Sequence, residues 1–305
     1  MLSRFLLAAV AALALAPAAP AQDSYSRTED VIYGRKFGTA LTMDVFTPAD
    51  KANGKGIIWC VSGGWYSSKE SVNPAVAQAF VERGYTVFAV MHGSQPKYSI
   101  PEAIGDMNRA VRFIKHNAKK YGVDPDKLGV AGGSAGGHLS LMLGAAPGEV
   151  NPKETDPVNK LSSQVAAVAC FYPPTDFLNY GKEGASALGD GTLKDFKAPF
   201  DFRELDTKTR SFVAVTDEAK RRVIGKTISP VYHVTKDSAP ALIIHGDADK
   251  LVPLQQSELI IARLKESKVP CELVVKKGAG HGWAGLDKDL PVFADWFDKY
   301  LLEKK

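Results

Sequence analysis

The fold prediction rests on the stretch Gly129-Val130-Ala131-Gly132-Gly133-Ser134-Ala135-Gly136-Gly137-His138 of the 305-residue chain. Its first residues continue a short apolar run typical of a buried strand, and residues 135–146 have the composition of a helix. Between the two lies G-x-S-x-G, centred on Ser134. Glycines two residues before and after a serine remove side chains that would collide in a sharp strand-to-helix turn. The stretch therefore predicts Ser134 as a nucleophile exposed at the tip of such a turn.

Strand-like and helix-like segments alternate on both sides of this turn. Short apolar or alternating runs predict strands at 31–37, 41–47, 56–61, 85–90, 127–131, 164–172, 241–245 and 271–276. Helical patterns cover 73–83, 99–118, 135–146, 254–265 and 286–302, the second opening with a capping box. This alternation predicts an α/β protein with a mostly parallel sheet and helices on both faces. The first two strands read as an antiparallel hairpin at one edge of that sheet.

The alternation stops between Pro173 and Pro230, where Gly, Lys, Asp, Pro and Thr dominate. A long irregular insertion at one point of such a sheet is more often a lid or a substrate-binding region than a linker. We therefore expect residues 22–305 to form a single domain with a lid at about 174–230.

Two later segments supply partners for the serine. Asp247 and Asp249 follow the strand at 241–245, and a carboxylate in such a loop can orient a histidine. Asp247 comes directly after a glycine, where an aspartate more commonly bonds the backbone of its own turn, so Asp249 is preferred. His281 lies in the glycine-flanked loop after the last strand and is the predicted general base.

The remaining histidines fit this role less well. His245 ends a strand and His138 lies one turn into the helix after Ser134, so both are expected to be buried and structural. His92, His116 and His233 have no partner that the sequence identifies. On the helix that follows the capping box, Asp106 and Arg109 are three residues apart and are expected to form a structural ion pair.

The chain order Ser134, Asp249, His281, carried by GGSAGGH (132–138), HGDADKLVP (245–253) and GAGHGW (278–283), resembles the α/β-hydrolase superfamily. More narrowly, the chain is similar to secreted esterases grouped with feruloyl and acetyl-xylan esterases and with hormone-sensitive-lipase-like carboxylesterases. The resemblance implies the α/β-hydrolase fold with an inserted lid region. It also implies a serine carboxylic ester hydrolase that forms an acyl-enzyme, and it suggests acetyl or feruloyl esters of polysaccharides as substrates.

One segment departs from the family pattern. The family usually has H-G-G-G-W after its third strand, whereas this chain has Val61-Ser62-Gly63-Gly64-Trp65. Backbone N–H groups remain available there for an oxyanion hole. We expect these groups to come from Gly63 or Gly64, together with Ala135.

The N-terminus and the composition limit where the protein acts. Residues 1–21 combine Arg4, an apolar run over 5–16 and an Ala-Pro-Ala site at 19–21, which predicts a signal peptide and export to the periplasm or beyond the cell. No later segment has 18 uninterrupted apolar residues, so no stable membrane span is expected. With 38 Lys+Arg against 34 Asp+Glu, the charge gives no argument for a nucleic-acid partner.

Cys60, Cys170 and Cys271 each lie in a predicted strand and are expected to be buried free thiols. The resemblance places the strands of Cys60 and Cys170 on opposite sides of the nucleophile strand, about 9–10 Å apart and beyond disulfide reach. The chain has no H-E-x-x-H and no paired-cysteine ligand set, so neither a metal nor a cofactor is expected.

Two alternatives to the esterase prediction remain. A serine peptidase of the prolyl-oligopeptidase type shares the motif and the chain order, although that group usually carries an N-terminal propeller for which the residues before Gly56 are too few. A hydrolase fold retained as a non-catalytic binding module is favoured only by the Val61-Ser62 departure. The expected partner is a small-molecule or polysaccharide-linked ester.

Overall fold

The computed structural model describes residues 24–302, and the predicted signal peptide at 1–21 lies outside this part of the chain. Within it, an eight-stranded sheet has the order β1-β2-β4-β3-β5-β6-β9-β10. These strands are Tyr25–Lys36 (β1), Thr39–Pro48 (β2), Gly56–Val61 (β3), Thr86–Met91 (β4), Leu128–Gly133 (β5), Ala167–Phe171 (β6), Ala241–Gly246 (β9) and Cys271–Lys276 (β10). The pairs β1–β2 and β2–β4 are antiparallel and the others are parallel. The predicted mostly parallel sheet with an antiparallel edge hairpin is confirmed.

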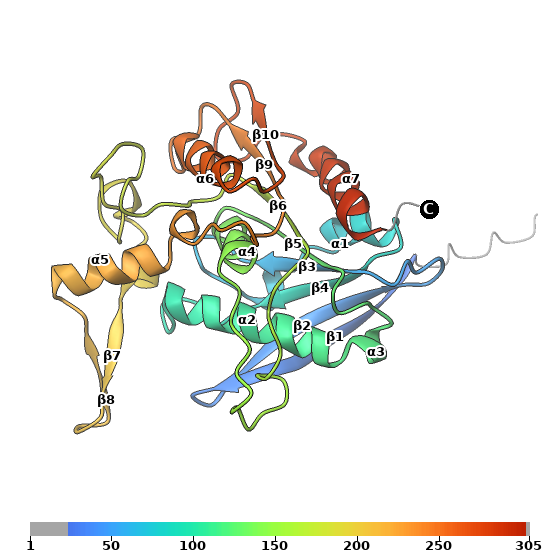
Figure 1. The fold of residues 1–305 in the computed structure, drawn as a ribbon, viewed down its shortest axis with the longest axis horizontal. Coiled ribbons are helices and arrows are strands. Elements are labelled where there is room, and N and C mark those ends of the chain that lie inside the picture. The colour runs from blue at the N-terminus through green and yellow to red at the C-terminus, as the bar shows by residue number, and fades with distance from the viewer. Residues whose placement is uncertain (1–23, 303–305) are drawn as a thin grey trace, which may run out of the picture.

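Helices cover both faces of this sheet (Figure 1). The α-helices are Pro74–Val81 (α1), Ile100–His116 (α2), Ala118–Tyr121 (α3), Ala135–Ala145 (α4), Glu218–Thr227 (α5), Gln255–Glu266 (α6) and Leu290–Leu301 (α7). Short 3-10 helices lie at Lys69–Ser71, Gly191–Leu193, Ala198–Phe200, Pro230–Tyr232 and Leu286–Asp289. One apolar core joins the sheet to α2, α4 and α6, and a second joins its other face to α1 and α7.

The central strands are buried on both sides, as a parallel sheet between two helical layers requires. In β3, Ile57 and Ile58 are both fully buried, yet they belong to opposite cores because successive side chains of a strand point to opposite faces. This explains why the strand reads as an uninterrupted apolar run. None of the described helices is both long and apolar enough to cross a bilayer.

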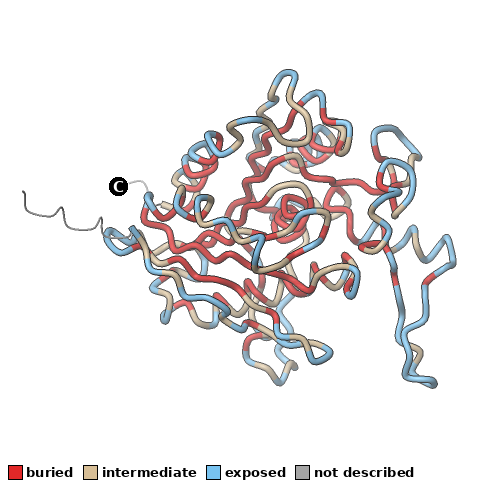
Figure 2. The backbone as a smooth tube through the Cα atoms, turned by 180° about the vertical axis from the view of Figure 1, so that it is seen from behind, coloured by how far each residue is buried: buried red, intermediate tan, exposed pale blue. Residues whose placement is uncertain are grey.

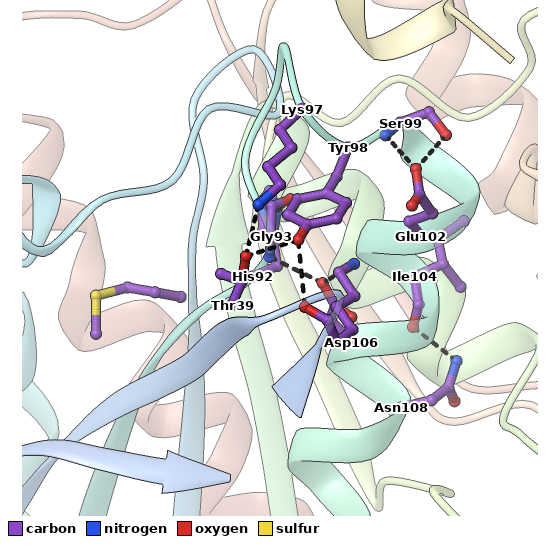
Figure 3. A network of polar contacts seen from close by, with 12 residues as sticks. Thr39, His92, Gly93, Lys97, Tyr98, Ser99, Glu102, Ile104, Asp106 and Asn108 are labelled. Atoms are coloured by element: carbon purple, nitrogen blue, oxygen red, sulfur yellow. Dashed lines mark hydrogen bonds and ion pairs between the residues drawn. The ribbon is translucent and has the colours of Figure 1, made fainter. Parts of the chain in front are cut away.

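The expected ion pair between Asp106 and Arg109 does not form. Asp106 lies on the buried face of α2, where its carboxylate accepts hydrogen bonds from the Lys36 ammonium at 2.6 Å and from the Gly93 N–H at 2.8 Å (Figure 3). Arg109 instead pairs with Asp156 at 2.7 Å. Residues three apart on a helix are neighbours, but here each side chain pairs with a residue from a distant part of the chain.

The insertion at 174–230 forms its own apolar cluster above the sheet. Phe177, Phe200 and other insertion residues pack around Trp65, which comes from the loop after β3. Two short strands, Arg203–Asp206 (β7) and Ser211–Ala214 (β8), pair as an antiparallel hairpin that extends away from the main body (Figure 1). Figure 2 shows this hairpin almost wholly exposed.

The three cysteines are free, as expected. Cys60 on β3 and Cys170 on β6 are buried and lie on either side of β5. Cys271 is only partly buried, contrary to the expectation, because it begins β10 at the edge of the sheet.

Candidate active site

Ser134 forms the turn between β5 and α4 with a φ of 53°, in the left-handed region that residues with a side chain rarely adopt. A β-carbon on Gly132 would lie 2.6 Å from the carbonyl carbon of Gly136, and one on Gly136 would lie 2.6 Å from the carbonyl oxygen of Cys60. Neither site has room for a side chain, so both glycines are needed for the turn. The turn presents the Ser134 hydroxyl at the N-terminus of α4, where developing negative charge is stabilised.

The structure brings the three predicted residues together from the carboxyl ends of three strands. The Nε2 atom of His281, in the loop after β10, lies 2.9 Å from Ser134 Oγ. The Nδ1 atom of His281 lies 2.7 Å from Oδ2 of Asp249, in the loop after β9. A carboxylate only accepts hydrogen bonds, so Nδ1 carries the proton and the Nε2 lone pair faces the serine hydroxyl. This tautomer is the one that a general base needs.

The Asp249 carboxylate is fully buried but well supplied with donors. Its Oδ1 atom accepts the N–H groups of Leu251 and Val252, each at 2.9 Å, and its Oδ2 atom accepts from His281. Burial alone would raise the pKa of Asp249, but the His245 ring, whose Nε2 lies 3.4 Å from Oδ2, and hydrogen bonds from His281 and the Val252 backbone outweigh it, and the pKa falls well below its usual value. Asp249 is therefore a carboxylate at neutral pH.

Asp247 has a different position. Its Oδ1 atom accepts the backbone N–H of Gly278 at 2.6 Å, and its side chain is exposed. The bond connects the loop after β9 to the loop that carries His281. Asp247 therefore accepts a hydrogen bond from a backbone N–H group, as expected for an aspartate after glycine. The N–H group belongs to the neighbouring loop and not to the turn of Asp247 itself.

The loop after β3 forms a tight turn beside Ser134. Gly63 and Tyr66 exchange two backbone hydrogen bonds, and Gly64 and Trp65 between them both have positive φ. The Gly63 N–H therefore already donates to the Tyr66 carbonyl, at 3.0 Å. Within residues 24–302, the N–H groups of Gly64 and Ala135 have no protein acceptor. Of the two alternatives for the first donor, Gly64 is the available one.

These elements surround a cavity of about 530 Å³ into which Ser134 and His281 face. Its wall includes Trp65, Tyr172, Pro174, Tyr180, Leu193, Phe196, Leu251 and Val252, with Ser62, Ser71 and Asn73 as polar members. No lysine, arginine, aspartate or glutamate is among its lining residues within the described chain. The site therefore offers no counter-charge to an ionised substrate group next to the reacting atoms.

The BD-FAE family model matches residues 43–264, which include Ser134 and Asp249. The chain belongs to the BD-FAE family. Among curated relatives of this BD-FAE chain is the probable carboxylic ester hydrolase LipM of Mycobacterium tuberculosis, 27% identical over 252 residues. That alignment covers 81% of the chain and 54% of LipM. The chain spans about half the length of the curated relatives it matches.

Solved structures share the fold of the BD-FAE chain over nearly its whole length. A truncated carbohydrate esterase from gut microbiota superposes with a TM-score of 0.72 at 24% identity, covering 93% of this chain and 99% of that one. An acetyl ester-xyloside bifunctional hydrolase from Caldicellulosiruptor lactoaceticus gives 0.70 at 21% identity, covering 88% and 95%. At these identities the similarity establishes the α/β-hydrolase fold.

Two further histidines of the BD-FAE chain are structural, as the sequence indicates. The Nδ1 atom of His138 accepts the Trp65 indole N–H at 3.1 Å, and its Nε2 atom donates to the Ile228 carbonyl at 2.7 Å. His245 bonds the Ser257 hydroxyl and the Val252 carbonyl. Both are fully buried. The described residues contain no cluster of three or more His, Cys, Asp or Glu side chains able to hold a metal ion.

His92, for which the sequence identifies no partner, is also buried, and its Nε2 atom lies 2.8 Å from the Ser62 hydroxyl. Burial lowers the pKa of His92 and that of His138 to about 4 in each case. Unfolded histidine titrates near 6.5. Between about pH 6.5 and pH 4 the unfolded chain therefore binds protons that the folded chain does not, and stability falls as the pH falls.

Each of these two histidines is expected to lower the free energy of unfolding by about 2 kcal/mol between pH 7 and pH 5. The measurement is denaturant unfolding at both pH values. His138→Gln should reduce the difference by about that amount, whereas replacement of the exposed His116 by glutamine should not change it. An unaltered difference in His138→Gln would mean that His138 takes up its proton over the same pH range in the folded and the unfolded protein.

Proposed function

We propose that this BD-FAE protein is a serine carboxylic ester hydrolase that uses Ser134, His281 and Asp249. The observation that carries the proposal is the unbroken line of hydrogen bonds from Asp249 through His281 to Ser134, with distances of 2.7 and 2.9 Å. The name of the relative LipM, a probable carboxylic ester hydrolase, supports the same reaction.

The geometry suits formation of an acyl-enzyme. His281 takes the proton of Ser134 as the hydroxyl oxygen attacks the ester carbonyl, and it then delivers this proton to the leaving alcohol. Asp249 keeps the imidazole in the required tautomer and stabilises its charged form. The N–H groups of Gly64 and Ala135 stabilise the oxyanion of the tetrahedral intermediate. Water, activated by His281 in the same way, releases the acid and regenerates the serine.

The proposed substrate is an uncharged acyl group linked to a sugar or a small alcohol. The uncharged cavity wall supports an uncharged acyl group. The superposed carbohydrate esterase supports a polysaccharide-linked ester, of which acetyl and feruloyl esters are the candidates. Residues 1–21 support export to the periplasm or the exterior, where such polysaccharides occur.

The insertion at 174–230 is proposed to act as the lid that sets acyl specificity. Its Phe196 lines the cavity and lies against the turn after β3, since a β-carbon on Gly64 would come within 2.7 Å of the Phe196 ring. Leu193 from the same segment also lines the cavity. The ring therefore limits the space available beside the predicted oxyanion donors.

Phe196→Ala is expected to enlarge this space and favour longer acyl chains. One methylene in an apolar pocket changes kcat/KM by about 10- to 200-fold. The ratio of kcat/KM for octanoyl to acetyl esters should rise at least about tenfold, as measured with a series of p-nitrophenyl esters. Phe212→Ala is the matched control, because Phe212 lies on the exposed hairpin strand β8. An equal octanoyl-to-acetyl ratio of kcat/KM in wild type and Phe196→Ala would show that Phe196 does not limit the space for the acyl chain.

A fluorophosphonate probe tests the proposed function directly. Labelling should occur on the Ser134 peptide and should be lost when the protein is unfolded, together with turnover of acetyl or feruloyl esters. A folded protein with neither labelling nor turnover would instead be a binding module. Faster cleavage of acyl-peptides than of esters would favour the peptidase alternative.

A further inference from the structure

Two loops at the carboxyl ends of neighbouring strands are joined by hydrogen bonds. The first is the turn of residues 62–66 after β3, called here the oxyanion turn. The second is residues 92–95 after β4, called here the clamp segment. In the clamp segment, the Gln95 side-chain amide donates to the Gly64 carbonyl and the Gln95 backbone N–H donates to the Trp65 carbonyl, both at 3.3 Å. The clamp segment therefore holds the two central residues of the oxyanion turn by their carbonyl oxygens.

A side-chain pair forms the shortest of these links. His92 Nδ1 lies 2.8 Å from the Gly93 carbonyl oxygen, which can only accept, so Nδ1 carries the proton. His92 Nε2 is then a lone pair, and it accepts the Ser62 hydroxyl proton at 2.8 Å. The imidazole is only 4% exposed. Ser62 itself is half-buried at the cavity wall, so the pair is partly buried, and its single arrangement of donor and acceptor fixes the position of Ser62.

Ser62 also contacts the element that carries the nucleophile. Its carbonyl oxygen accepts the N–H of Gly136, in the first turn of α4, at 3.3 Å. Ser62 thus links three parts of the site: the oxyanion turn, the clamp segment and the helix whose first N–H belongs to Ala135.

The clamp segment is itself held in place by buried groups. The Gly93 N–H donates to the Asp106 carboxylate at 2.8 Å, and Lys36 donates to the same oxygen at 2.6 Å (Figure 3). A β-carbon on Gly93 would lie 2.6 Å from the Tyr98 ring. Figure 3 shows the dashed line that joins Gly93 to the Asp106 carboxylate. The segment is therefore a fixed support for the oxyanion turn.

We propose that Ser62 and His92 are positioning residues that hold the Gly64 N–H in place for the oxyanion, with the clamp segment as their support. The inference rests on the proposed esterase function. His92 is not among the residues that line the cavity, whereas Ser62 lines it beside Gly63 and Gly64. Each acts through the oxyanion turn, so their loss should weaken binding of the transition state more than binding of the substrate.

Ser62→Ala is expected to lower kcat at least about tenfold with KM within twofold, since direct loss of an oxyanion donor costs about 10²–10³. The affinity for a trifluoromethyl ketone, whose oxyanion occupies the same place, should fall in parallel. Ser62→Thr keeps the hydroxyl and should stay within about threefold of wild type. Backbone hydrogen exchange of residues 62–67 should be faster than in wild type for Ser62→Ala but not for Ser62→Thr.

Ser68→Ala is the matched control, because the Ser68 hydroxyl bonds Ser71 and Glu70 and, within residues 24–302, bonds neither the clamp segment nor α4. Unchanged ketone affinity in Ser62→Ala would overturn the proposal, even if kcat fell, since the loss would then be a general effect on folding. An unchanged rate of hydrogen exchange at residues 62–67 in Ser62→Ala would also overturn the proposal, whatever the activity of the variant. Absence of ester turnover and of Ser134 labelling in wild type would refute the proposed function instead. Hydrogen exchange would then still test whether Ser62 and the clamp segment hold the oxyanion turn in place.

Discussion

Replacing Ser134 with alanine is expected to lower kcat for ester hydrolysis by about 10⁴- to 10⁶-fold, with little change in KM. The hydroxyl is the only group on the strand-to-helix turn that can form the acyl-enzyme, and His281 has nothing to deprotonate without it. The fold should be unaffected, because Ser134 is held by its backbone N–H bond to the Phe171 carbonyl at 2.9 Å. Initial rates on an acetyl ester and circular dichroism of the same sample provide the measurement.

Ser140→Ala is the control for this experiment. Ser140 lies on the same helix, α4, and its hydroxyl bonds the Gly136 carbonyl at 2.8 Å and not the histidine. It should keep activity within a few-fold of wild type. If Ser134→Ala retained more than about one per cent of wild-type kcat, the nucleophile assignment would be wrong. Water attack assisted only by His281 and the oxyanion donors accounts for a far smaller residual rate.

The sequence predicts the strands around the site well because their signals are local. The strands at 56–61 and 271–276 match β3 and β10 residue for residue, since both are short β-rich runs bounded by turn residues. The G-x-S-x-G motif predicts the Ser134 turn for the same reason: the steric need for Gly132 and Gly136 is contained within five residues.

Features that depend on distant parts of the chain were not predictable in this way. The β7–β8 hairpin is missing from the prediction because each strand has only four residues and β7, Arg203–Asp206, is mostly charged, so neither gives a clear strand pattern. The bond between His92 and Ser62 spans 30 residues and leaves no spacing pattern. Gly63 and Gly64 are equivalent in sequence, and only the turn that pairs Gly63 with Tyr66 makes their N–H groups different.

Asp249→Asn is expected to lower kcat by about 10⁴-fold, close to the effect of removing an orienting aspartate from a Ser-His-Asp triad. The amide can keep one oxygen for the N–H groups of Leu251 and Val252, now held at 2.9 Å by Oδ1. Its NH₂ group then faces His281 Nδ1 in place of Oδ2. An NH₂ group donates, so the imidazole must accept at Nδ1 and carry its proton on Nε2, facing Ser134. A base in that tautomer cannot take the serine proton.

Asp247→Asn is the matched test, because the two aspartates lie two residues apart in one loop and undergo the same change. An asparagine at 247 keeps an oxygen for the Gly278 N–H, now at 2.6 Å from Oδ1, so the loop that carries His281 stays in place. Its kcat should remain within about tenfold of wild type. The two variants measured side by side on one ester decide the assignment. Equal losses would show that Asp249 acts only through the loop, and a larger loss at Asp247 would make Asp247 the orienting carboxylate.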